Sequence, residues 1–139
     1  MIYGQFQYYS DELSSWTRTI DFLKDELRES IRQIGILRDQ QVISATSEKA
    51  GETFTGRCIV QEQQFEHITY QIIGQKQRLE RTALCTGRPI DVPVSQTQDA
   101  LRSKMKIAER NFLQTKYTCS ATCRHFLATG HSLFRINNI

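Results

Sequence analysis

Apolar residues recur along the chain at alternating steps of three and four positions, which is the spacing of one buried stripe on a helix. Charged side chains fill the positions between them, as on the solvated face of an amphipathic helix. In the first such segment, Ser10 or Asp11 can cap the start of a helix, and Gly51 suggests the end of that helix. The pattern predicts a first helix over about residues 11–47, whose stripe is Leu13, Trp16, Ile20, Leu23, Leu27, Ser30, Ile34 and Leu37.

A second and a third stripe follow the same rule. The second predicts a helix over about residues 53–84, with the stripe Phe54, Cys58, Gln61, Phe65, Ile68, Ile72, Gln75 and Leu79. Gly87 and Pro89 form a stop signal after it. The third predicts a helix over about residues 96–130, with the stripe Leu101, Met105, Ala108, Phe112, Thr115, Cys119, Thr122, Phe126, Thr129 and Leu133. Ser95 and Gln98 have the spacing of a capping box at its start.

The connection between the second and third helices, residues 86–95, holds both prolines of the chain and is expected to be an extended loop. Its Ile90, Val92 and Val94 can pack over one end of a bundle. Because short connections place neighbouring helices antiparallel, the chain is expected to be all-α, an antiparallel up-down-up bundle of three long coiled-coil-like helices. Its 139 residues are enough for one domain spanning 1–139, and its 7 Gly and 2 Pro are too few for the turns of an all-β fold.

Turns near residues 50 and 90 would fix which stripe residues of the three helices lie at the same height along the bundle, which we call a level. The expected apolar levels are Ile20 with Leu79 and Leu101, Leu27 with Ile72 and Ala108, Ile31 with Ile68 and Phe112, and Ile34 with Phe65 and Thr115. The next two levels are polar: Leu37 with Gln61 and Cys119, and Gln41 with Cys58 and Thr122. Such polar levels in bundles usually fix the register, but they could also form a small pocket or thiol site.

The thiols are the best-placed candidates for metal chemistry. Cys58, Cys119 and Cys123 should gather at one end of the bundle, away from Cys85. They are weak metal candidates, because zinc sites usually combine two ligand pairs and the second pair is missing here. Free, half-buried thiols are the expected state, and we predict no cofactor.

No other pattern in the sequence indicates catalysis. His67, His125 and His131 fall outside the stripes and are expected to be exposed, so no cysteine–histidine pair can be placed. A Glu-x-x-His pair, which di-iron bundles use, is absent, and so is a glycine-rich phosphate loop. We therefore predict that the chain is not an enzyme.

Positive charge is concentrated late in the chain. Residues 85–139 hold eight Lys or Arg and three acids, a net of +5, whereas residues 1–84 have a net of −2. Nucleic-acid binding by the basic third helix is therefore one hypothesis. The alternative is that these cations pair with the acidic first helix, and their spread around the polar arc favours it.

Apolar side chains outside the stripes are the main functional signal. A three-helix core cannot bury them, and an aromatic arm precedes the first helix, so protein–protein interaction or self-association is the favoured function. The candidate interaction residues are Tyr3, Phe6, Tyr8, Tyr9, Phe22, Ile36, Ile43, Ile73, Ile107 and Leu113. No apolar run is long enough to span a membrane and no leader is visible, so a cytoplasmic protein that binds a partner or a second copy is expected.

Overall fold

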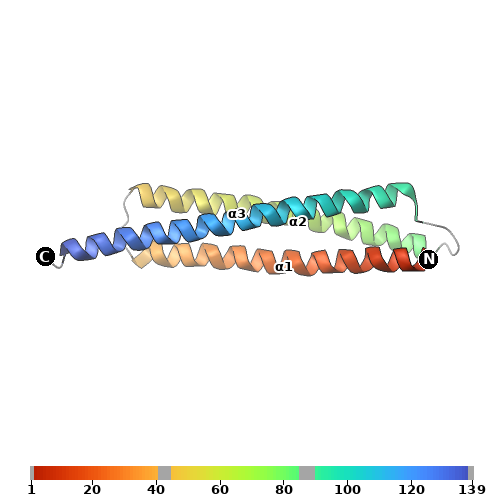
Figure 1. Cartoon of the computed structure of the whole chain (residues 1–139), viewed down its shortest axis with the longest axis horizontal. Helices are drawn as coiled ribbons and strands as arrows, with labels where there is room; N and C mark the ends of the chain where they lie inside the picture. The colour runs from red at the N-terminus through yellow and green to blue at the C-terminus, as the bar shows by residue number, and fades with distance from the viewer. Residues whose placement is uncertain (1, 41–44, 85–89, 138–139) are drawn as a thin grey trace. The chain divides into compact units, whose positions relative to one another are not determined.

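The computed structural model describes the backbone of residues 2–40, 45–84 and 90–137, and side chains within 4–39, 48–82 and 90–124. This part of the chain forms three α-helices, α1 (Ile2–Gln40), α2 (Ala45–Leu84) and α3 (Val92–Asn137), and no strand (Figure 1). The prediction of an all-α, three-helix bundle is confirmed. The second stripe is confirmed, because all eight of its members are buried. The first stripe is buried except for Trp16 and Leu37, which are half-buried. The third is buried from Leu101 to Thr122, and the side chains of Phe126, Thr129 and Leu133 lie outside the described residues.

The helices are longer than predicted, and the first connection lies elsewhere. α1 begins at Ile2 instead of residue 11, so the aromatic arm is helical. α1 ends at Gln40 and α2 begins at Ala45, which makes the predicted bounds 47 and 53 wrong. Gly51 caused the error, because it is buried inside α2 and does not end a helix. A helix tolerates an interior glycine at a cost of about 1 kcal/mol.

The predicted proline loop is wrong over residues 92–95. α3 begins at Val92, and Pro93 stands in its first turn, where the missing N–H removes no helical bond. Ser95 donates its backbone N–H to the Asp91 carbonyl at 3.1 Å, so Ser95 lies inside the helix and is not its cap. Ile90 and Val94 are buried as expected, whereas Val92 is exposed. Residues 85–89 and Cys85 lie outside the described residues.

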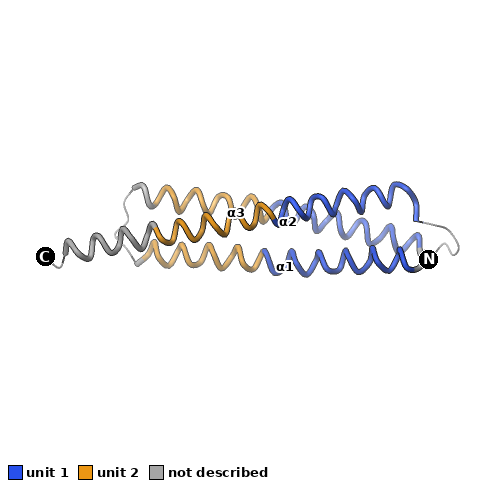
Figure 2. Tube along the Cα trace, viewed as in Figure 1, with its two compact units in different colours: residues 1–23, 63–109 blue, residues 24–62, 110–139 orange. Residues whose placement is uncertain are grey.

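The helices are divided between two compact units, residues 1–23 with 63–109 (unit 1) and residues 24–62 with 110–139 (unit 2), as Figure 2 shows. In each unit a segment of α1, one of α2 and one of α3 surround an apolar core. Unit 1 buries Leu13, Ile20, Phe65, Ile72, Leu79, Leu101 and Met105. Unit 2 buries Leu27, Ile34, Phe54, Cys58, Phe112 and Cys119.

Hydrogen bonds between helices give the direction of each segment. In unit 1, Tyr9 and Glu12 of α1 contact α3 at Ser95 and Arg102, which is a parallel pairing. In the same unit α2 runs antiparallel to α3, through the pairs Gln75–Gln98 and Gln71–Lys104. In unit 2 the α2–α3 pairs are Gln61–Thr115 and Arg57–Thr118, again antiparallel. The up-down-up order is therefore confirmed in unit 1, and the antiparallel α2–α3 pairing is confirmed in both units.

The predicted levels of α1 against α3 are wrong by about two helical turns, and those of α2 against α3 by about one turn. The expected level of Leu101 was that of Ile20, yet Glu12 binds the adjacent Arg102. Gln61 was expected beside Cys119 but donates to Thr115. The misplacement of α1 comes from the first turn. This turn lies between Gln40 and Ala45 instead of near residue 50, so α1 is shifted along its axis relative to the other two helices.

Candidate functional site

Unit 1 holds a connected polar layer, which we call the glutamine layer: Glu12, Gln75, Gln98 and Arg102. Gln75 Nε2 donates to Gln98 Oε1 at 3.0 Å and to the Val94 carbonyl at 2.9 Å. Gln98 Nε2 donates in turn to Glu12 Oε1 at 2.9 Å. Both glutamines are 0% exposed. The layer therefore joins α1, α2 and α3 through side chains inside the core.

The outer end of the glutamine layer is an ion pair. Arg102 donates from Nε and Nη2 to the two oxygens of Glu12, at 2.9 and 2.7 Å. Burial by itself would raise the pKa of Glu12, but hydrogen bonds from Arg102 and Gln98 outweigh it and hold that pKa below its ordinary 4.5. The same bond from Glu12 is the main cause of the raised pKa of Arg102. The two-bond geometry makes this a strong, orienting contact between α1 and α3.

Unit 2 has polar core groups of a different kind. Gln61 Nε2 donates to Thr115 Oγ1 and, at 2.7 Å, to the Asn111 carbonyl. Buried Ser30 bonds the Glu26 carbonyl of its own helix at 3.0 Å. Among the described residues, the buried Oε1 atoms of Gln61 and Gln75 have no hydrogen-bond partner, and an unpaired buried acceptor lowers stability.

The thiols of unit 2 gather as predicted. Cys58 and Cys119 are both buried and close enough to influence each other's charge, and Cys119 is hydrogen-bonded to Cys123. Burial, and then the neighbouring Cys119, raises the pKa of Cys58 to about 11, and the same two causes raise that of Cys123 to about 11. A raised thiol pKa disfavours the thiolate, which is the reactive and metal-binding form.

Metal binding at Cys58, Cys119 and Cys123 gains no support from this arrangement. All three are free cysteines. Within the described residues, no group of three His, Cys, Asp or Glu side chains is placed to hold an ion. His67 is exposed on α2, whereas the side chains of His125 and His131 lie outside the described set. Cys58 and Cys119 are buried in the core of unit 2, and Cys123 is half-buried beside them.

The cations of α3 divide into paired and unpaired sets. In unit 1 Arg102 binds Glu12, and in unit 2 Lys116 binds Glu26 at 3.2 Å. Both pairs join α3 to α1, which supports the interpretation that the basic helix complements the acidic one. In contrast, Lys106 and Arg110 have no carboxylate partner in the described part of the chain.

Five of the predicted interaction residues are exposed: Phe22, Ile36, Ile73, Ile107 and Leu113. Tyr8 is also exposed and Phe6 is half-buried. The prediction of Tyr9 as an interaction residue is wrong, because Tyr9 is buried. Its ring is 8% exposed and its hydroxyl shares a 3.2 Å hydrogen bond with Ser95 Oγ, because the arm is helical and turns Tyr9 toward α3. The side chains of Tyr3 and Ile43 lie outside the described set.

Sequence reasoning missed two of the most exposed aromatic residues. Tyr70 is 76% exposed on α2, and Tyr117 is 73% exposed on α3. Both lie off their stripes, so the rule that selected Leu113 would have found them too. Tyr117 is one turn from Leu113, and Tyr70 is one turn from Ile73, so each pair forms a small apolar surface on its helix.

Comparison with known proteins finds no matching family model, no matching curated protein and no matching solved structure. None of the three helices, over the residues described, has a segment with the length and apolar character needed to cross a bilayer.

Proposed function

We propose that the chain is a non-enzymatic helical protein that binds a protein partner or a second copy of itself through exposed apolar helix faces. The observation that carries this proposal is the exposure of Leu113 and Tyr117, 67% and 73% respectively, one turn apart on α3 of unit 2. Contiguous apolar side chains on a protein surface are typical of interaction sites. Aromatic residues in particular are enriched in the cores of interfaces.

Charge on the same flank of α3 supports the proposal. Arg110 precedes Leu113 by about one turn and is exposed without a carboxylate partner in the described residues. Arg is enriched in interfaces together with aromatic residues, because its planar head both stacks and forms several hydrogen bonds. The Leu113–Tyr117 pair with Arg110 thus has the composition of an interface core beside a polar rim.

Light scattering of the full chain tests self-association directly. A mass above the 16.2 kDa monomer that falls in a Leu113→Ser/Tyr117→Ser variant is the expected result for a second copy. For a different partner, the expected result is a monomer whose capture of a defined protein from extract is lost in the same variant.

The matched control is Ile59→Ser/Val60→Ser, which removes two exposed apolar side chains from α2 in unit 2 that are not among the candidate interaction residues. This control should leave the mass, or the captured protein, unchanged. A strict monomer that captures nothing with or without the Leu113–Tyr117 pair would overturn the proposal.

A further inference from the structure

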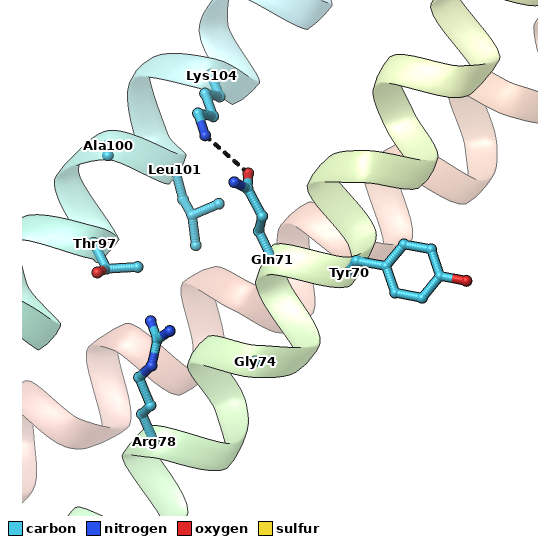
Figure 3. A pocket seen from close by; sticks show the side chains of 8 residues that line it. All are labelled: Tyr70, Gln71, Gly74, Arg78, Thr97, Ala100, Leu101 and Lys104. Atoms are coloured by element: carbon cyan, nitrogen blue, oxygen red, sulfur yellow. Dashed lines mark hydrogen bonds between the residues drawn. The ribbon is translucent and has the colours of Figure 1, made fainter.

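Unit 1 has a hollow on its surface between α2 and α3, of about 460 Å³. Gln71, Gly74 and Arg78 line it from α2, and Thr97, Leu101 and Lys104 line it from α3 (Figure 3). Its volume is in the range of pockets that hold small molecules. The residues combine an apolar floor at Leu101 with polar groups at both ends, which is the usual composition of a small-ligand site.

The charged groups of the hollow have one sign. Arg78 and Lys104 line it, and no carboxylate does. Lys104 Nζ donates to Gln71 Oε1 at 3.0 Å across the two helices, which leaves two of its three protons for another acceptor. Arg78 forms no ion pair with any described side chain. The hollow therefore presents unneutralised positive charge between two helices.

Gly74 of α2 leaves room for a ligand in the wall of the hollow. A Cβ added to Gly74 would meet nothing within 4 Å, so the glycine is not needed for close helix packing. Glycine inside a helix lowers its stability relative to alanine, and a close approach of another backbone usually accounts for it. Here the space beside Gly74 opens into the hollow (Figure 3).

The two cations are separated along the hollow. Arg78 is seven residues from Gln71, which Lys104 contacts, so it lies about 10 Å along α2 from that contact. One simple anion could not reach both ends without drawing the side chains together. A ligand with two or more anionic groups could bind Arg78 at one end and Lys104 at the other.

We propose that this hollow binds a small ligand that carries at least two phosphate groups. Arg78 supplies a planar fork that matches phosphate oxygens, and Lys104 supplies a point charge at the opposite end. Leu101 contacts the apolar part of the ligand, and the Gln71 amide completes the polar rim. This site is separate from the apolar surface of the proposed function, because it needs neither Leu113 nor Tyr117.

Titration calorimetry of the full chain with inorganic tripolyphosphate at low ionic strength tests the proposal. Saturable binding to one site is expected. The variant Arg78→Gln/Lys104→Gln should weaken binding by at least about tenfold, since both charge-assisted contacts are lost. Arg81→Gln/Lys106→Gln is the matched control, because it removes the same two charges from exposed positions of the same helices outside the hollow, and it should change the affinity less than about twofold.

A second variant separates shape from charge. Gly74→Leu keeps every charge but fills the wall of the hollow, so tripolyphosphate binding should fall while the helical circular dichroism stays that of the parent. Equal loss in the hollow and control charge variants, or no binding by the parent, would overturn the proposal. Tighter binding of citrate would show that carboxylates are the ligand groups, and tighter binding of a single-stranded oligonucleotide would assign the cations to a polymer; either result contradicts the proposal.

Discussion

The polar core of unit 1 is one network that links three helices, whereas the polar contacts of unit 2 are separate and each links two helices: Gln61 joins α2 to α3, and Lys116 joins α3 to α1 at Glu26 and Ser30. In unit 1 the chain Gln75–Gln98–Glu12–Arg102 links three helices and ends in a two-bond ion pair. In unit 2 Gln61 bonds only to α3, at Thr115 and the Asn111 carbonyl, and thiols occupy the neighbouring core. Two units made from the same three helices therefore specify their packing differently.

The difference shows how a polar group fixes register in a bundle. Apolar contacts alone tolerate sliding by a heptad, because every stripe residue resembles the next. The hydrogen bonds of Gln98 oppose such a shift, because it would separate the Glu12 carboxylate and the Gln75 amide from their partners. Each buried polar group left without a hydrogen bond costs about 1–3 kcal/mol. We infer that unit 1 sets the register of its helices, and that unit 2 relies more on the fit of its apolar side chains.

The largest effect is expected from Gln98→Ala in unit 1. It removes three buried hydrogen bonds and leaves a cavity, so the free energy of unfolding should fall by about 2–4 kcal/mol. Urea unfolding followed by the fluorescence of Trp16, the single tryptophan and a unit 1 residue, measures this loss.

The control for this prediction is Gln75→Leu/Gln98→Leu, which replaces both glutamine partners with apolar side chains. It should recover part of the stability, because neither glutamine is left without the other and Glu12 keeps its two hydrogen bonds from Arg102. A loss below about 0.5 kcal/mol in Gln98→Ala would show that the network does not stabilise unit 1.

Alkaline pH should destabilise unit 2. The pKa of Cys58 is about 11 in the fold against 9.0 for an ordinary thiol, so the folded state holds its proton more tightly than the unfolded chain. Stability is therefore full below about pH 9 and falls through about pH 11, by on the order of 2 kcal/mol. Hydrogen exchange of the amides of residues 50–62 against pH measures the loss. Cys58→Ala should reduce the pH dependence, and the part that remains should come from Cys123, whose pKa is also raised to about 11.

Acidic pH should destabilise unit 1. The pKa of Glu12 is lowered in the fold, so its contribution is present above the ordinary value of 4.5 and is lost as pH falls below it. The Trp16 fluorescence midpoint in urea should drop over that acid range, and Glu12→Gln should remove the dependence. A loss of stability in acid that affects unit 2 and leaves unit 1 unchanged would contradict the stabilising role of Glu12 in unit 1.

The sequence predicted the stripes correctly, because burial of a helix face depends on local periodicity. The levels are wrong, because they depend on where the chain turns: Gly51 suggests a helix end, whereas α1 ends at Gln40. The thiol group is predicted because Cys58 and Cys119 both lie on stripes. The glutamine layer is not, because Glu12 lies off the stripe and the spacing of Ser95 and Gln98 indicates a cap.

A smaller effect is expected from Thr115→Val in unit 2. The change keeps the shape of the side chain but removes the acceptor of Gln61, which retains the Asn111 carbonyl. The free energy of unfolding should fall by about 1 kcal/mol, less than for Gln98→Ala, because no linked network is broken. Urea unfolding by circular dichroism gives the value, and a loss equal to that of Gln98→Ala would remove the distinction between the two units.

The smallest effect is a gain, and it should be the same in both units. Gly74 of unit 1 and Gly56 of unit 2 lie inside α2, and a Cβ at either would meet nothing within 4 Å. Alanine at each position should raise the free energy of unfolding by about 0.5–1 kcal/mol, because alanine loses less backbone entropy in a helix. Urea unfolding of Gly74→Ala and Gly56→Ala compares the gains. A loss at Gly74 with a gain at Gly56 would mean that the wall of the hollow is packed, which would also remove the room that the proposed ligand requires.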